Sequence, residues 1–175
     1  MLKNWAKLRV EHLPRAIKIG VAGVAALYVA NFLKLPQAYW AAISAFVVMG
    51  ADVGATVRAS WSRLIGTAIG AVAGALFVQL WGNHLWSFGL AAIATVLLCT
   101  VLNLEQSYRL ACVTVAIVML IHSADSPWRL ALWRFLEVAV GIMVALAISA
   151  LPPKTSPREI GMGEEINGRQ AGLPE

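Results

Sequence analysis

Residues 39–76 read YWAAISAFVVMGADVGATVRASWSRLIGTAIGAVAGAL, two apolar runs around a short polar break. A bilayer core about 30 Å thick needs roughly 20 helical residues, so we expect a membrane helix at 64–81 and a short, tilted or broken span at 38–51. The break between them predicts a re-entrant or interfacial turn that lines a cytoplasmic vestibule, with Arg58 attracting anions. The alternative is a solvated loop whose arginine follows the positive-inside rule.

The rest of the chain is similarly apolar. Of its 175 residues, 59% are hydrophobic and 13% are charged, and the mean hydropathy is +0.72, whereas soluble domains have about 45–50% apolar and about 25% charged residues. This composition excludes soluble globular, disordered and collagen-like classes. The net charge of +5 does not indicate nucleic acid as a partner, because the basic residues lie at the ends of apolar runs instead of in one patch. We therefore expect an all-α protein embedded in the lipid bilayer.

Six apolar segments are candidates for membrane helices. They are separated by short breaks that are polar or contain Pro or Gly, and their ranges are 16–34, 38–51, 64–81, 85–104, 108–123 and 132–151. All but one of the tryptophans fall at or beside a boundary, where amphipathic rings prefer the headgroup level; they are Trp40, Trp61, Trp81, Trp86, Trp128 and Trp133. The chain thus divides into a basic interfacial segment at 1–14, a six-helix membrane domain at 15–151 and a disordered cytoplasmic tail at 152–175.

The positions of lysine and arginine predict the orientation. With both termini cytoplasmic, most basic residues lie on the inner side, as the positive-inside rule requires. The inner residues are Lys3, Lys7, Arg9, Arg15, Lys18, Arg58, Arg63, Arg109, Lys154, Arg158 and Arg169. Only Lys34, Arg129 and Arg134 then lie on the outer side. We expect a multi-pass protein of the inner (plasma) membrane.

The two halves of the chain resemble each other weakly. Residues 39–49 match 108–119 with one residue of slippage, and 62–74 match 133–145, so that Arg63 corresponds to Arg134 and Gly70 to Gly141. Each half holds three spans, and the second copy must then enter from the opposite side of the membrane. This predicts an inverted 3+3 repeat, an arrangement typical of secondary transporters. The alternative is that two Ala/Val/Ile-rich helices look alike by composition alone.

The segment quoted above also resembles a known family. Its Tyr-Trp-Ala start, its G-A-T-x-R turn and the following R-x-x-G-T-x-x-G-x-x-x-G are similar to the fusaric acid resistance (FUSC) or aromatic acid exporter proteins, as is RFLEVAVGI at 134–142. The resemblance covers about residues 15–151. It implies a six-helix unit of the inner membrane that exports aromatic or other organic carboxylates. Larger members are similar to two such units joined by soluble domains, so a single unit is expected to act as a homodimer or larger assembly.

Charged residues within apolar segments are the candidate substrate-binding residues, because a charge at the bilayer centre costs at least about 2.5 kcal/mol. Arg63 and Arg134 begin the third and sixth predicted helices, where each guanidinium could bind a carboxylate through two parallel hydrogen bonds. The alternative for both is a snorkelling helix-end anchor, which fits Arg134 poorly on the outer side. Glu137 lies on the same helix face as Arg134 and is either a proton-coupling carboxylate or the structural partner of that arginine.

Tyrosines and glycines complete the set of candidate residues. Tyr39 and Tyr108 could line the path and stack on an aromatic substrate, although interfacial tyrosines are also common. Small residues at four-residue spacing let helix backbones approach closely, so a packing role is expected for Gly66, Gly70, Gly74 and Gly141.

No enzymatic, metal or cofactor chemistry is expected. Cys99 and Cys112 lie in apolar stretches and predict neither a disulfide nor a metal site, and His84 and His122 have no second ligand at metal spacing. An intramembrane serine protease would need a G-x-S sequence, which the chain lacks. The function most favoured is export of an organic anion. A non-transporting membrane scaffold or accessory subunit of an efflux system is the second possibility.

Overall fold

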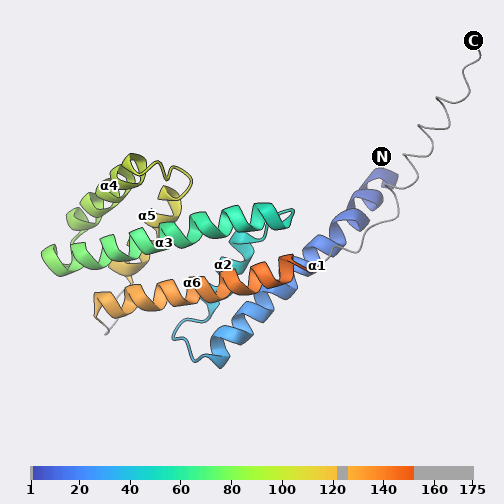
Figure 1. Cartoon of the computed structure of the whole chain (residues 1–175), viewed down its shortest axis with the longest axis horizontal. Coiled ribbons are helices and arrows are strands. Elements are labelled where there is room, and N and C mark those ends of the chain that lie inside the picture. The colour runs from blue at the N-terminus through green and yellow to red at the C-terminus, as the bar shows by residue number, and fades with distance from the viewer. Residues whose placement is uncertain (1, 122–125, 152–175) are drawn as a thin grey trace, which may run out of the picture.

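A computed structural model describes residues 2–121 and 126–151, with side chains from residue 13 onward except that of Pro14. Within these residues the protein is entirely α-helical, without strands, as the sequence predicted (Figure 1). The six helices are α1 (Leu2–Phe32), α2 (Tyr39–Val48), α3 (Val53–Trp81), α4 (Leu85–Val101), α5 (Tyr108–Leu120) and α6 (Pro127–Ser149). The predicted tail at 152–175 and His122 lie outside the described residues.

Three helices begin earlier than the sequence predicted: α1 starts at Leu2 instead of residue 16, and α3 and α6 also start early. The side chain of Asp52 accepts a hydrogen bond from the backbone N–H of Ala55 (2.8 Å), and this cap starts α3 at Val53 instead of residue 64. The turn predicted for the polar break is therefore wrong, because the residues after Asp52 are helical. Ser126 caps α6 in the same way with proline at the first helical position, so α6 starts before residue 132.

Because α3 and α6 begin early, Arg63 and Arg134 lie further from the ends of their helices than the sequence predicted. At 1.5 Å per residue, Arg63 lies about 15 Å along α3 from its first residue, and Arg134 about 10 Å along α6. Neither arginine stands at the beginning of its helix, where both were predicted. A side chain so far from a helix end reaches the headgroup region less easily, which weakens the snorkelling interpretation for both.

The helices fall into long and short classes. Three segments are long and apolar enough to cross a membrane, namely residues 15–32 of α1, α3 and α6. The apolar helices α2, α4 and α5 are shorter, with 10, 17 and 13 residues. By its rise, α2 is about 15 Å long, half of a bilayer core. Helix α1 continues without interruption through Pro14, which is the predicted end of the basic interfacial segment.

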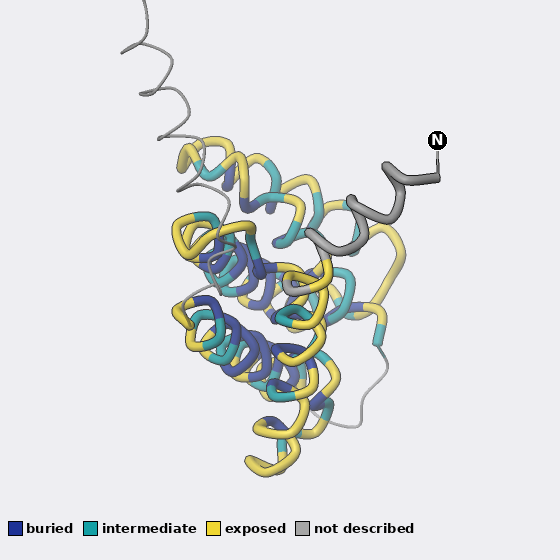
Figure 2. The backbone as a smooth tube through the Cα atoms, turned by 90° about the vertical axis from the view of Figure 1, so that its right-hand side faces the viewer, coloured by how far each residue is buried: buried dark blue, intermediate teal, exposed yellow. Residues whose placement is uncertain are grey.

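Helices α3 and α6 lie side by side at the centre of the molecule (Figure 1). Helix α2 packs against α1 and α6, and α5 packs against α4 and α3. Each packing pair therefore has a counterpart when α1, α2 and α3 are exchanged with α4, α5 and α6. For example, the contact of α1 with α2 corresponds to that of α4 with α5, and the contact of α2 with α6 to that of α5 with α3. Buried residues lie where helices meet, and exposed residues cover the outward faces (Figure 2). Many of these exposed residues are large and apolar, as expected for a surface that faces lipid.

The turns before α2 and α5 have the same backbone structure. Lys34 and Asn103 both have positive φ, 54° and 55°. In each turn the backbone N–H of the following residue donates a hydrogen bond to the backbone oxygen five residues earlier. These bonds run from Leu35 to Ala30 (3.0 Å) and from Leu104 to Cys99 (2.8 Å). This is the Schellman pattern that ends a helix with one left-handed residue. The match extends to sequence, because residues 35–39 and 104–108 both read Leu-x-Gln-x-Tyr.

Candidate functional site

Arg134 and Glu137 form a buried ion pair on α6. The side chains are 2% and 0% exposed, and Arg134 Nη1 lies 2.9 Å from Glu137 Oε2. Their spacing of three residues places them on one helix face, as the sequence predicted. A buried charge is strongly destabilising without a partner, so each group requires the other in this position. One donor remains unused, because Arg134 Nε is buried without a hydrogen bond.

Gln37, in the turn before α2, joins this pair to the rest of the protein. Its side-chain oxygen accepts hydrogen bonds from Arg134 Nη2, from the hydroxyl of Tyr39 (2.6 Å) and from Trp40 Nε1 (3.2 Å). Its backbone N–H donates to Glu137 Oε1 (2.9 Å), and the guanidinium of Arg134 lies 4.9 Å from the centre of the Trp40 ring. Sequence reasoning missed Gln37, although the repeated Leu-x-Gln-x-Tyr could have indicated it.

Arg63 is buried in a different environment. Its side chain, on α3, is 7% exposed, and its Nε donates to the hydroxyl of Ser44 on α2 (3.1 Å). Ser44 in turn donates to the backbone oxygen of Trp40 (2.7 Å). Among the residues that the structure describes, no acidic side chain pairs with Arg63, whereas Arg134 has Glu137. Arg63 is thus a buried cation with a neutral hydroxyl as its hydrogen-bond partner.

Arg63 of α3 and Arg134 of α6 both contact α2, at positions one helical turn apart. Trp40 stacks on Arg134, and Ser44, one helical turn further on, holds Arg63. One turn is about 5.4 Å, so the two guanidinium groups contact successive positions on one face of α2. We call Arg63, Arg134, Glu137, Trp40 and Ser44 the two-arginine site.

The glycines bring the surrounding helices close together. A Cβ atom at Gly141 of α6 would overlap the backbone oxygen of Ala41, which places α6 directly against α2 beside Ser44. On α3, a Cβ at Gly66 would lie 2.7 Å from the oxygen of Ser107, and one at Gly70 would overlap the oxygen of Ala111. Gly74 similarly faces Val118. The α3 glycines therefore face α5 within the same chain.

The remaining candidate residues lie apart from the two-arginine site. Tyr108, at the start of α5, accepts a hydrogen bond from Arg109 Nε (3.2 Å). Arg58 is exposed near the start of α3. In the described part of the chain, neither Tyr108 nor Arg58 contacts Arg63 or Arg134 through a hydrogen bond, ion pair or ring contact. Nor do three His, Cys, Asp or Glu side chains gather there in a group that could hold a metal ion.

Comparisons with known proteins place this architecture in a family. The family described as "Aromatic acid exporter family member 1" matches residues 12–151. The chain belongs to the aromatic acid exporter family. This confirms the resemblance drawn from the Tyr39–Leu76 segment, and the match covers all of α2 to α6. No solved structure matches the chain.

Curated relatives of this exporter-family chain are longer proteins. The "Uncharacterized transporter YdhK" of Escherichia coli K12 is 31% identical over 162 residues, covering 87% of this chain and 24% of that protein. The UPF0421 protein OB2406 of Oceanobacillus iheyensis is 33% identical, covering 67% of this chain and 34% of that protein. The UPF0421 protein YgaE of Bacillus subtilis is 28% identical, covering 80% and 40%. The chain thus spans a quarter to two fifths of these relatives, and the comparisons support a transporter role.

Proposed function

We propose that this chain exports organic carboxylates, including aromatic ones, along the face of α2 that lies between α3 and α6. The observation that carries the proposal is Arg63, a buried guanidinium whose hydrogen-bond partner is the neutral Ser44. A buried cation without an anion is costly, and a planar guanidinium fits a carboxylate through two parallel hydrogen bonds. Membership of the aromatic acid exporter family supports the same substrate class.

Transport proceeds in two binding steps. The substrate carboxylate first pairs with Arg63, which has no acidic partner among the described residues. One turn back along α2, toward its first residue, it reaches Arg134 beside Trp40, where it displaces Glu137. Glu137 then becomes a buried carboxylate without its partner, and it takes up a proton because a buried carboxylate strongly disfavours its charged form. When the carboxylate leaves Arg134, Glu137 releases this proton and the ion pair re-forms, so each substrate that passes couples to one proton.

The proton step is tested by Glu137→Gln, which keeps the shape of the side chain and removes its titration. Export of benzoate by the variant should no longer respond to a proton gradient. Unchanged coupling in this variant would remove the proton role and leave Glu137 as the structural partner of Arg134.

The path further requires six membrane crossings in an inverted 3+3 repeat, with both termini in the cytoplasm. The paired helix packing and the matching turns at Lys34 and Asn103 support this arrangement. In a background with Cys99 and Cys112 replaced by alanine, a membrane-impermeant maleimide should label Lys34→Cys from outside intact cells. It should label Asn103→Cys only after the cells are permeabilised. Labelling of both positions from one side would contradict the inverted arrangement.

We also propose that the chain works in the inner membrane as a homodimer or larger assembly. Its outward faces carry many exposed apolar residues that a second copy could share with lipid. Light scattering of the purified protein in detergent should give at least twice the chain mass. A monomer that transports would contradict this part of the proposal.

Flux of benzoate into proteoliposomes, with and without a proton gradient, separates transport from a scaffold or accessory role. A transporter should move benzoate faster than protein-free vesicles under at least one gradient. Absence of flux under every gradient would overturn the proposed function.

A further inference from the structure

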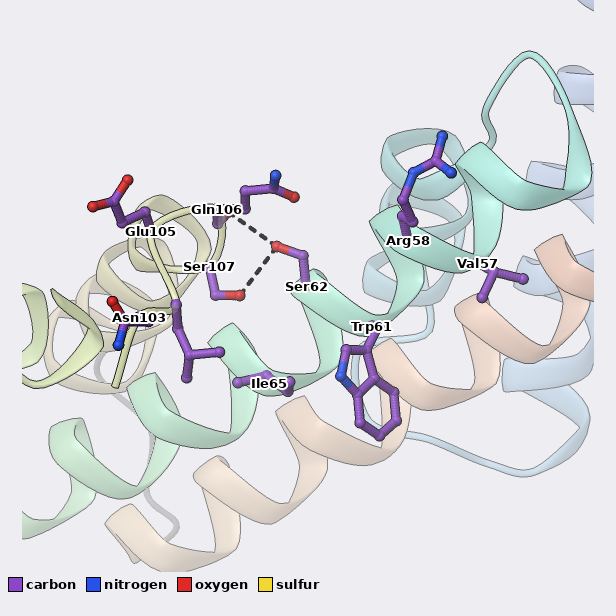
Figure 3. Close-up of a pocket in the computed structure, with 10 residues that line it drawn as sticks. Val57, Arg58, Trp61, Ser62, Ile65, Asn103, Glu105, Gln106 and Ser107 are labelled. Atoms are coloured by element: carbon purple, nitrogen blue, oxygen red, sulfur yellow. Dashed lines mark hydrogen bonds between the residues drawn. The ribbon is translucent and has the colours of Figure 1, made fainter. Parts of the chain in front are cut away.

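A cavity of about 720 Å³ lies between the first half of α3 and the turn that leads into α5 (Figure 3). This volume is within the range of small-molecule sites, roughly 300–1,000 Å³. Its α3 residues belong to a different face of that helix from Arg63, which points to α2. The cavity is therefore separate from the two-arginine site.

Hydrogen bonds fix one wall of this cavity. The hydroxyl of Ser62 donates to the backbone oxygen of Gln106 (3.0 Å) and lies 3.1 Å from the hydroxyl of Ser107. These bonds, drawn in Figure 3, attach the turn to α3. The close approach of Gly66 to Ser107, one turn further along α3, holds the same wall. Contacts within the chain thus hold this wall in place.

The polar groups that remain free in this cavity are suited to an anion. Arg58 and the side-chain amide of Gln106 line it, and within the described residues neither side chain makes a hydrogen bond. In Figure 3 the Gln106 side chain extends above the cavity toward the side on which Arg58 lies. Glu105 projects from the opposite side of the turn, away from Arg58. Arg58 therefore supplies a positive charge at this end of the cavity, with the carboxylate of Asp52 nearby: Arg58 Nη1 and Asp52 Oδ2 both lie within 4 Å of the Cβ position of Gly54.

The equivalent position in the other half of the chain is already occupied. Gln37 has the place in the first Leu-x-Gln-x-Tyr turn that Gln106 has in the second. The amide oxygen of Gln37 binds Arg134, Tyr39 and Trp40. Within the described residues the amide of Gln106 makes no such bonds, so the second turn presents an unused hydrogen-bonding group to the cavity that Arg58 also lines.

We propose that this cavity binds an aromatic monocarboxylate. The carboxylate lies between the guanidinium of Arg58 and the amide N–H groups of Gln106, and the ring packs against Trp61 and Ile65. Glu105 disfavours a second negative charge on the ligand. This inference rests on the proposed function and adds to it a loading site, which faces the cytoplasm in the proposed orientation and precedes Arg63.

Equilibrium binding of benzoate to the full chain in detergent tests the site without any gradient. The measurement is made by titration calorimetry in an Arg63→Gln background, which removes the first carboxylate-binding arginine of the two-arginine site. Arg58→Gln and Trp61→Leu should each weaken benzoate binding about tenfold, equivalent to about 1.4 kcal/mol. Because both side chains are exposed, the variants should fold normally. Matched controls are Arg15→Gln and Trp86→Leu, exposed residues outside the cavity, which should leave binding unchanged.

Two further comparisons define the ligand class. Glu105→Gln should tighten benzoate binding about twofold by removing a like charge, and benzamide should bind at least tenfold more weakly than benzoate. Equal binding of benzamide and benzoate, or no effect of Arg58→Gln, would overturn the proposed site. If benzoate binds in this cavity but no flux is found, the proposed function fails and the site stands. If flux is found without binding here, only the site fails.

Discussion

At the scale of single residues, two arginines at corresponding sequence positions have opposite environments. Arg134 has an acid, an amide and an aromatic ring, whereas Arg63 has a hydroxyl. The sequence predicted the pairing of Arg134 with Glu137 because three residues on a helix define a shared face. It could not predict the contacts of Gln37 or Ser44, because these depend on how the turn before α2 and α2 itself pack against α6 and α3.

The buried ion pair should matter strongly for stability, because Arg134 and Glu137 neutralise each other's charge. Glu137→Ala leaves Arg134 buried without its anion, and we expect the free energy of unfolding in detergent to fall by about 3–5 kcal/mol. Replacing both residues by leucine should restore most of this loss, because no uncompensated charge remains. If Glu137→Ala and the double variant are equally destabilised, the pair does not stabilise the protein by neutralisation.

The two corresponding glutamines should respond differently to the same substitution. Gln37→Ala removes the acceptor of three hydrogen bonds and should lower the free energy of unfolding by about 1–3 kcal/mol. Gln106→Ala is the matched control, since its side chain makes no hydrogen bond in the described residues, and should change stability by less than about 0.5 kcal/mol. Equal effects in urea or thermal unfolding would contradict the assigned roles.

At the scale of helices, the sequence located all six elements but misplaced the starts of α1, α3 and α6. The apolar runs defined α1 to α6, whereas Asp52 and Ser126 extended α3 and α6 through polar residues that hydropathy assigned to loops. Local capping decided these boundaries, and hydropathy averages do not detect it. The error mattered for the site, because it placed Arg63 and Arg134 at helix ends instead of well inside their helices.

Glycine packing between α3 and α5 gives a further test at this scale. Gly70→Ala introduces a Cβ that would overlap the oxygen of Ala111, so α3 and α5 must separate and stability should fall by about 1–3 kcal/mol. Gly89→Ala on α4 is the control, because nothing lies within 4 Å of its Cβ position. That variant should gain up to about 1 kcal/mol from helix propensity. Thermal unfolding of both variants in the same detergent measures these effects. We expect Gly70→Ala to lower the unfolding temperature and Gly89→Ala to raise it.

At the scale of the whole molecule, family membership and the long apolar helices agree on a membrane transporter. The resemblance was predictable from residues 39–76, because the spacing of arginines and glycines is a local pattern. The proposed pathway was not predictable in the same way, since it depends on three helices meeting around Trp40 and Ser44. The central claim is that Arg63, buried without an acid, receives the carboxylate of the substrate.

Benzoate flux into proteoliposomes by Arg63→Gln, compared with the wild-type chain and Arg15→Gln, tests this claim most directly. Arg63→Gln keeps a hydrogen-bond donor for Ser44 and removes an unpaired charge, so the variant should fold at least as stably as the wild type. We predict that its flux falls at least about tenfold and that Arg15→Gln transports normally. Wild-type flux by a correctly folded Arg63→Gln variant would contradict the account.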